Sequence, residues 1–334
     1  MESKKIGIIQ NYGSASGGSA YEQMVAKAAQ NIGEVIPIIL KRRQWLPSYF
    51  ANMLLGQKIT QDPNILILTL NAAVGLNWKK HQHQKKILIW HHYDPLATTN
   101  NNTQRAFLYN QLYKKVLKNA SKIDVLVVVG EYWRSFFAKY NFPQIKVIYN
   151  AFDLDFINNV KNTINTTAIR KKIGIKKNQR LIYIGQLQKM KSADRIWTAL
   201  KHREDLFLIG SGQKNIELPI YHFSGNYKDY LTMLGTCDVA LSMSQMYEGW
   251  NRTAHEAMLM GTPVIGNAIG NSGELLCGAK QKICHNFNNL PIVIEEVLKN
   301  KNILSKSALS YAQQEKFTQP FFKNQWESLI KDQL

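Results

Sequence analysis

The sequence predicts an α/β protein built from two similar, doubly wound halves. Its length of 334 residues suits two domains better than one or three. Short β-rich runs alternate with longer helical runs, which is the pattern of a parallel sheet covered by helices. This alternation restarts after a polar stretch at 158–167. A content of 45% hydrophobic residues is enough to fill two ordinary cores.

In the first half, apolar β-rich runs are separated by runs with helical periodicity. The polar stretch 158–167 has few apolar residues to anchor it, so we expect a linker there. The expected strands are 5–10, 34–40, 64–70, 86–91, 124–129 and 146–149, and the clearest helices are 19–31, 102–120 and 131–140.

The second half repeats this plan. We expect domains at 1–160 and 161–316, and a last helix at 317–334. The expected strands are 180–184, 206–209, 220–223, 238–243 and 263–265, and the expected helices are 192–201, 227–235, 252–260 and 318–334.

The chain is strongly basic, with a net charge of +19. Residues 1–160 carry +10 and the remainder +9, so the excess charge does not form a nucleic-acid-binding tail. No DNA or RNA recognition module is visible, and the aromatic residues are not grouped for base stacking. We therefore expect no nucleic-acid partner. Phosphate-bearing small molecules or an anionic membrane surface suit this charge better.

The three cysteines, Cys237, Cys277 and Cys284, are an odd number without C-x-x-C spacing. This argues against a disulfide framework or a zinc site and favours a reducing cytoplasm. No apolar segment follows the opening MESKK, so we expect no signal peptide. The most apolar runs, 65–70 and 125–129, are too short to span a bilayer.

The most informative segment is 246–265, MYEGWNRTAHEAMLMGTPVI. A buried-strand pattern precedes it, and Gly261-Thr262-Pro263 ends its helix before another strand. Glu248 should lie on the strand-to-helix loop and Glu256 in the first turns of the helix. Both carboxylates can then face the carboxyl end of a parallel sheet, where open α/β sheets bind ligands. Because a helix N-terminus attracts anions, a nucleotide sugar fits this combination.

Glu248-x7-Glu256 followed by Ala257-Met258-x2-Gly261-Thr262-Pro263 resembles the donor-site motif of retaining glycosyltransferases of the GT-B fold, family-4 type. The resemblance is strongest over 180–266. It implies two Rossmann-like domains that face each other across a cleft, with the last helix crossing back to the first domain.

The resemblance also implies roles for residues of the motif. Glu248 would hold sugar hydroxyls and Glu256 the ribose hydroxyls. The start of the helix would hold the donor phosphates. The donor-binding residues expected in this segment are Gly249, Trp250, Asn251, Arg252, Thr253 and Glu256.

The run Gly185-Gln186-Leu187-x3-Lys191 is similar to the Gly-Arg-Leu-x3-Lys element whose two cations hold the donor diphosphate in the family. Lys191 matches, whereas Gln186 replaces the usual arginine. A glutamine brings no charge, and a charge-assisted hydrogen bond is about twice as strong as a neutral one. Lys189 or Arg252 are candidates for the missing cation.

Two further segments of the first half resemble family elements. The glycine-rich run 13–19 joins the first strand to the first helix, and Gly17 and Gly18 match a Gly-Gly pair that faces the donor phosphates in the family. His91, with His92 as second choice, matches a histidine near the transferred sugar. We expect His81 and His83 to lie on the surface.

The segment 41–55 mixes cations, aromatic and aliphatic residues, a composition typical of interfacial membrane docking. Plain core helices can have the same composition. If it docks, the protein would be cytoplasmic and peripheral on the inner face of a membrane. The acceptor would then be a lipid-linked or cell-surface glycan, although a small-molecule acceptor stays open.

The expected chemistry is metal-independent transfer of a hexosyl unit from a nucleoside diphosphate sugar, used as co-substrate, with retention at the anomeric carbon. Lys191, Glu248 and His91 are the expected catalytic residues, and no metal or separate cofactor is expected. The alternative is a non-catalytic protein that binds sugar nucleotides or glycans, which Gln186 favours. A GT-B epimerase or phosphorylase is a further alternative that no residue favours.

Overall fold

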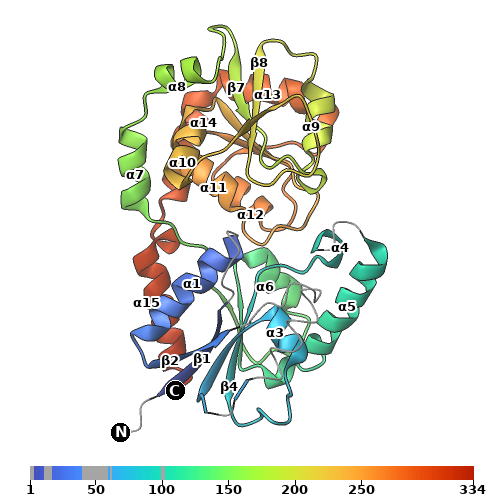
Figure 1. Cartoon of the computed structure of the whole chain (residues 1–334), viewed down its shortest axis with the longest axis vertical. Coiled ribbons are helices and arrows are strands. Elements are labelled where there is room, and N and C mark those ends of the chain that lie inside the picture. The colour runs from blue at the N-terminus through green and yellow to red at the C-terminus, as the bar shows by residue number, and fades with distance from the viewer. Residues whose placement is uncertain (1–3, 11–16, 40–58, 61, 99–101) are drawn as a thin grey trace. The chain divides into compact units, whose positions relative to one another are not determined.

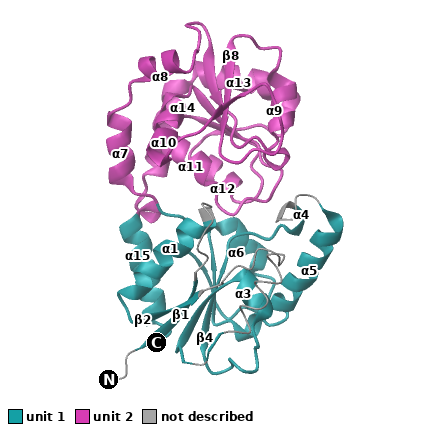
Figure 2. Ribbon diagram, in the orientation of Figure 1, with its two compact units in different colours: residues 1–151, 319–334 teal, residues 152–318 magenta. Residues whose placement is uncertain are grey.

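The computed structural model describes residues 4–10, 17–39, 59, 60, 62–98 and 102–334. The chain divides into two compact units (Figure 2): unit 1 contains residues 1–151 and 319–334, and unit 2 contains residues 152–318. The described part of each unit contains one sheet of six parallel strands, with helices packed against it (Figure 1). The boundary lies at residue 151, nine residues before the expected one.

The sheet of unit 1 has the strand order β2-β1-β3-β4-β5-β6. Strands β3 to β5 are buried almost throughout because helices cover both faces, which explains their continuous apolar runs. The elements are β1 Lys5–Gln10, α1 Gly17–Gln30, β2 Glu34–Ile39, β3 Ile65–Thr69, α3 Leu70–Gly75, β4 Lys85–Trp90, α4 Pro95–Thr98, α5 Thr103–Leu117, η1 Ala120–Lys122, β5 Val125–Val128, α6 Glu131–Phe137, β6 Ile145–Val147 and α15 Gln319–Lys331.

Helix α15 returns to unit 1 at the end of the chain and packs along α1. Phe322 and Trp326 are buried against the ring of Tyr21, whose hydroxyl donates to the carbonyl of Ile148 at 3.0 Å. Unit 1 is therefore assembled from both ends of the chain.

The sheet of unit 2 has the strand order β12-β11-β10-β7-β8-β9. The chain starts at β7, moves outward to β9, then returns to β10 and moves outward on the other side. This is the order of a Rossmann sheet, and its direction reverses between β7 and β10.

The elements of unit 2 are α7 Leu154–Asn162, α8 Thr166–Lys172, β7 Arg180–Tyr183, η2 Lys189–Lys191, α9 Ala193–Leu200, β8 Leu206–Ser211, β9 Tyr221–Phe223, α10 Tyr227–Thr236, β10 Val239–Ser242, α11 Arg252–Leu259, β11 Val264–Gly266, α12 Ser272–Gly278, β12 Lys282–Ile283, η3 Phe287–Asn289, α13 Leu290–Lys299, α14 Lys301–Ala312 and η4 Glu315–Phe317.

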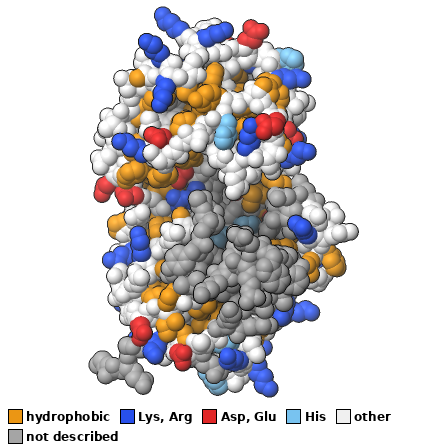
Figure 3. All heavy atoms as spheres, viewed as in Figure 1, with side chains coloured by type: hydrophobic (Ala, Val, Ile, Leu, Met, Phe, Trp, Pro, Cys, Tyr) orange, Lys and Arg blue, Asp and Glu red, His pale blue; other side chains and the backbone are white. Residues whose placement is uncertain are grey.

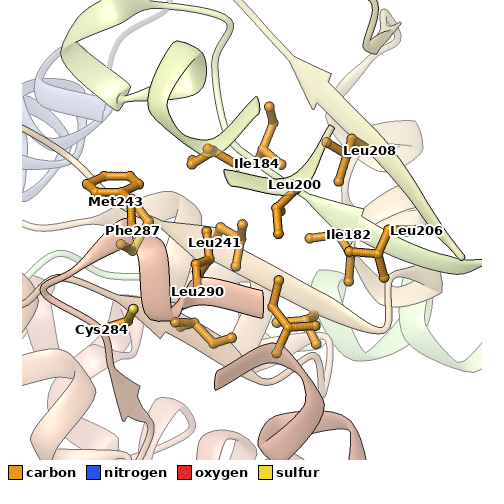
Figure 4. Packing of buried hydrophobic residues seen from close by; sticks show 14 of the residues in the cluster. Ile182, Ile184, Leu200, Leu206, Leu208, Leu241, Met243, Cys284, Phe287 and Leu290 are labelled. Carbon is orange, nitrogen blue, oxygen red and sulfur yellow. The ribbon is translucent and has the colours of Figure 1, made fainter. Parts of the chain in front are cut away.

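The core of unit 2 lies between its sheet and the helices α9 and α13 (Figure 4). Ile182 and Leu241 on the two central strands are almost fully buried, as is Leu290 at the start of α13. This core fixes the carboxyl ends of the central strands, from which the candidate site residues extend.

The expected linker at 158–167 is wrong. Helix α7 spans Leu154–Asn162 and α8 starts at Thr166. The side chain of Asp153 caps α7 by accepting a hydrogen bond from the backbone N–H of Phe156 at 3.0 Å, and Ile157 and Val160 are buried. The apolar residues are few, but their helical spacing places them on one face.

His81 is also not a surface residue, because it is 1% exposed. Its Nδ1 lies 2.5 Å from the side-chain oxygen of Gln84. Burial lowers the pKa of His81.

The segment 41–55 lies outside the described residues, so the membrane expectation for it stays a prediction. Among the described helices, none is both long and apolar enough to span a membrane.

Candidate active site

The candidate site of unit 2 starts at the loops that follow β7 and β10. These two strands pair with each other at the centre of the sheet, where the strand order reverses. Lys191 lies in η2 after β7, and Glu248 lies in the loop after β10. Their position agrees with the general rule that open α/β sheets bind ligands at the carboxyl ends of the strands at such a point.

The side chains of Lys191 and Glu248 form an ion pair between Nζ and Oε1. The Glu248 side chain is 9% exposed and that of Lys191 is 27% exposed, so the pair lies at the edge of solvent. A buried carboxylate without a cation would lose its hydration without compensation. Lys191 therefore stabilises the carboxylate and also places one positive charge beside it.

Backbone hydrogen bonds hold the two loops together. The N–H of Gln245 donates to the carbonyl of Met190 at 2.8 Å, and the side chain of Gln245 donates to the carbonyl of Lys189 at 2.9 Å. The loop that carries the cation and the loop that carries the carboxylate are thus fixed to each other.

A third loop, 267–271 after β11, braces Glu248 from the other side. Gly270 forms a β-bridge with Glu248 and has φ +66°. A Cβ atom at Gly270 would lie 2.7 Å from the backbone N and O of Glu248, so a side chain does not fit there. Asn271 is fully buried and donates from its side chain to the carbonyl of Gly249. Sequence reasoning left this loop without a role.

Helix α11 begins directly after the Glu248 loop. Asn251 caps it, accepting a hydrogen bond from the N–H of Ala254 at 3.0 Å. Trp250 is 7% exposed and donates from Nε1 to Nδ1 of His255 at 3.2 Å. Gly249 is buried, and Thr253 is partly buried in the first turn.

His255 packs α11 against residues from the beginning and the end of unit 2. Its ring stacks on Phe152 at 4.2 Å and meets Phe317 edge-on, and its Nε2 lies 3.0 Å from the carbonyl of Ala312. Burial lowers its pKa to about 3, so His255 is neutral at pH 7. We interpret it as a positioning residue that fixes the helix carrying Glu256.

Glu256 is buried at 5% exposure on α11. Its Oε1 accepts from Nη2 of Arg252 at 3.3 Å and from the hydroxyl of Tyr227 at 3.2 Å. Burial raises the pKa of Glu256, and the charge of Arg252 and the hydroxyls of Tyr227 and Tyr230 oppose this rise. The sequence does not reveal the two tyrosines, because they lie on α10, far from the motif.

The two candidates for the missing cation differ in their surroundings. Arg252 is held between Glu256 and the ring of Phe152, which lies 4.5 Å from its guanidinium carbon. Lys189 is exposed. Gln186 is partly buried, and its Nε2 is 3.2 Å from where a Cβ atom of Gly212 would lie, so its amide faces the loop after β8.

Three sequence-predicted residues belong to unit 1. Helix α1 begins at Gly17 and includes Gly18, while the loop 11–16 lies outside the described residues. His91 follows β4. Its Nε2 is buried without a hydrogen-bond partner among the described residues, and the Glu22 carboxylate is 4.0 Å away. Burial lowers the pKa of His91 to about 4, so its ring is neutral at pH 7.

Asp153-Leu154-Asp155 has the spacing of an Asp-x-Asp metal motif, but Asp153 is the cap of α7. Over residues 4–10, 17–39, 59, 60, 62–98 and 102–334, no three His, Cys, Asp or Glu residues lie close enough together to hold a metal ion. Metal independence stays a prediction.

Residues 165–315 match the family described as glycosyl transferases group 1. The match covers most of unit 2. The match contains every candidate site residue of unit 2, from Gln186 to Glu256. No curated protein sequence matches the chain.

Solved structures share the fold along nearly the whole length. Sucrose-phosphate synthase from Thermosynechococcus elongatus superposes with a TM-score of 0.75 at 15% identity, covering 98% of both chains. Anabaena HepE in complex with UDP and glucose gives a TM-score of 0.71 at 14% identity, covering 98% of this chain and 100% of the other. The chain therefore has the GT-B fold.

Proposed function

We propose that this protein transfers a hexosyl unit from a nucleoside diphosphate sugar to an acceptor, with retention at the anomeric carbon. One observation carries the proposal: the Lys191–Glu248 pair lies at the reversal point of a family-matched sheet, directly before the helix that holds Glu256. A cation, two carboxylates and a helix start suit a ligand that carries both phosphates and hydroxyls.

The chemistry requires that the departing diphosphate be stabilised. Lys191 would neutralise its charge, and the first turn of α11, from Asn251 to Thr253, would offer backbone N–H groups to a phosphate oxygen. Glu248 would accept hydrogen bonds from sugar hydroxyls, and Glu256 from the ribose hydroxyls. No part of this scheme needs a metal, and we propose a metal-independent transfer.

His91, Gly17 and Gly18 are proposed to contribute from unit 1. A neutral imidazole can accept a hydrogen bond from a sugar hydroxyl without repelling a developing positive charge. The glycines would let the backbone approach the donor phosphates.

The first donor to test is UDP-glucose. The Anabaena HepE structures include complexes with UDP and with UDP-glucose. At 14% identity the ligands of HepE cannot be assigned to this protein, but they indicate which donor to test first. We propose a lipid-linked or cell-surface glycan as acceptor, with a small molecule as alternative. We also propose a cytoplasmic location that is peripheral to the inner face of a membrane.

Proton NMR of the donor sugar tests the proposal. The protein is incubated with UDP-glucose and a panel of acceptors, without metal and then with Mg²⁺. We expect free UDP to appear together with a product of unchanged anomeric configuration, at the same rate under both conditions. An inverted product would contradict the retaining mechanism, and a strict Mg²⁺ requirement would contradict metal independence.

The second candidate is a non-catalytic protein that binds sugar nucleotides, which Gln186 favours. It predicts saturable binding of a donor without release of the nucleoside diphosphate under any condition. Release of the nucleoside diphosphate therefore separates the two functions, and Gln186→Arg tests the observation behind the second. If the glutamine has weakened the diphosphate site, this variant binds the diphosphate more tightly than the wild type.

A further inference from the structure

Helix α5 has one side that is exposed along its whole length. Positions 104, 107, 111, 114 and 118 recur at helical spacing on one side, with 108 and 115 beside them. On the opposite side, Tyr113 and Val116 are buried and hold the helix to unit 1. We call the exposed side the α5 face; its residues are Gln104, Phe107, Leu108, Gln111, Lys114, Lys115 and Lys118, and all are exposed.

The N-terminal end of the α5 face is apolar. Phe107 is 66% exposed and Leu108 is 37% exposed. Helix α4 packs on α5 and adds Leu96 at 45%. Single exposed apolar side chains are common on protein surfaces, but several together on adjoining helices indicate an interaction site.

The C-terminal end of the α5 face is cationic, and no acid interrupts it. Between Asp94 and Asp124 the sequence contains five Lys or Arg and no Asp or Glu.

The surroundings of Ile292 on α13 of unit 2 are different. Ile292 is equally exposed at 64%, but the helical spacing places Glu295 and Glu296 beside it. Lys and Arg side chains are spread over the visible surface of both units (Figure 3). On the α5 face they share one helix with the exposed apolar residues Phe107 and Leu108.

We propose that the α5 face docks on an anionic lipid bilayer. Lys114, Lys115 and Lys118 follow Phe107 by seven to eleven residues, which is about 10–16 Å along a helix. A helix lying in the plane of the interface therefore places Phe107 and Leu108 at the acyl boundary and the lysines at the headgroup phosphates. An RNA partner fits less well, because Leu108 and Leu96 give no stacking surface for bases.

This docking does not depend on glycosyl transfer, and it uses a different segment from 41–55. The α5 face also lies close in the chain to a candidate site residue of unit 1. Helices α4 and α5 follow β4, whose carboxyl end carries His91. The membrane contact would therefore lie on the elements that directly follow the strand carrying that histidine.

Co-sedimentation with vesicles tests the proposal. The full chain is mixed with phosphatidylcholine vesicles, with or without about one third phosphatidylglycerol, at low and high salt. We expect binding to the anionic vesicles that weakens with salt. Phe107→Gln/Leu108→Gln should weaken it at least tenfold. Lys114→Gln/Lys115→Gln/Lys118→Gln should also weaken it at least tenfold, since each lysine near the surface contributes a factor of about five.

Ile292→Gln is the matched control, because it removes an equally exposed apolar side chain that lies beside acidic residues. It should bind vesicles within twofold of the wild type. Thermal unfolding of each variant shows whether a loss of binding reflects a loss of fold.

Three results would overturn the proposal. In the first, the wild type does not sediment with anionic vesicles. In the second, the wild type sediments, but both α5 variants bind the vesicles as tightly as the wild type. In the third, the wild type binds only a single-stranded RNA, and the lysine variant loses that binding. None of them bears on the donor site, because vesicle binding is measured without nucleotide.

Discussion

At the scale of single residues, Glu256 should show a conflict between stability and function. Burial raises its pKa above the unfolded value of about 4.3, so the charged carboxylate costs stability once the pH rises through the folded pKa. We expect Glu256→Gln to raise the free energy of unfolding at pH 7 while it weakens nucleotide binding.

The advantage of Glu256→Gln should vanish toward pH 3, where the wild-type carboxyl group is protonated in both states. Thermal unfolding of the two proteins at pH 7 and pH 3 measures this difference. A variant that is clearly less stable at pH 7 would contradict the account, because it would mean that Arg252 and the tyrosines more than offset the burial of the charge.

His91 gives the opposite dependence on pH. Its pKa is lowered to about 4, whereas an unfolded histidine titrates near 6.5. As the pH falls through this window, the unfolded state takes up a proton first, so stability is lost. We expect the melting temperature of His91→Asn to fall less than that of the wild type between pH 7 and pH 4.5. Parallel curves for the two proteins would show that His91 is not buried in its neutral form.

At the scale of helices and strands, α7 depends on its cap. Asp153→Ala removes the acceptor for the N–H of Phe156 and should lower the free energy of unfolding by about 1 kcal/mol. Asp155→Ala, in the first turn of the same helix, removes a charge but no cap. It should lower the free energy of unfolding by only a few tenths of a kcal/mol. Chemical denaturation measures both. Equal effects would mean that the helix dipole, not the cap, is the cause.

Most of the strands and the motif helix could be predicted because their signals are local, whereas the two-residue strand β12 was not expected. The apolar runs of β1, β3 and β7 are bounded by polar residues, and Gly261-Thr262-Pro263 ends α11 in the sequence itself. Helix α7 was missed because its capping residue lies just before the stretch that looked like a linker. The burial of His81 was missed because its partner, Gln84, is polar, so the run looks exposed.

At the scale of the whole molecule, most of the site's support comes from distant parts of the chain. Phe152 and Phe317, which enclose His255, are 165 positions apart in the sequence, and no local pattern joins them. Tyr227 reaches Glu256 from α10. The sequence therefore predicted candidate site residues, but not the residues that hold them in place.

Helix α15 makes unit 1 depend on the end of the chain. Trp326→Ala empties a fully buried position beside Tyr21 and should lower the stability of unit 1 by about 3–5 kcal/mol. Lys323→Ala, whose side chain is 54% exposed on the same helix, is the control and should have little effect. Calorimetry measures both. We expect nucleotide binding by unit 2 to persist at low temperature in Trp326→Ala.

The central claim is that unit 2 holds a nucleoside diphosphate through Lys191. Isothermal titration with UDP, GDP, ADP, CDP and dTDP, without metal and then with Mg²⁺, tests it most directly. We predict that one diphosphate binds with micromolar affinity. Lys191→Ala should lose at least tenfold of that affinity, and Lys201→Ala, an exposed lysine directly after α9, less than twofold. Binding that survives Lys191→Ala unchanged, or no binding of any diphosphate, would contradict the account.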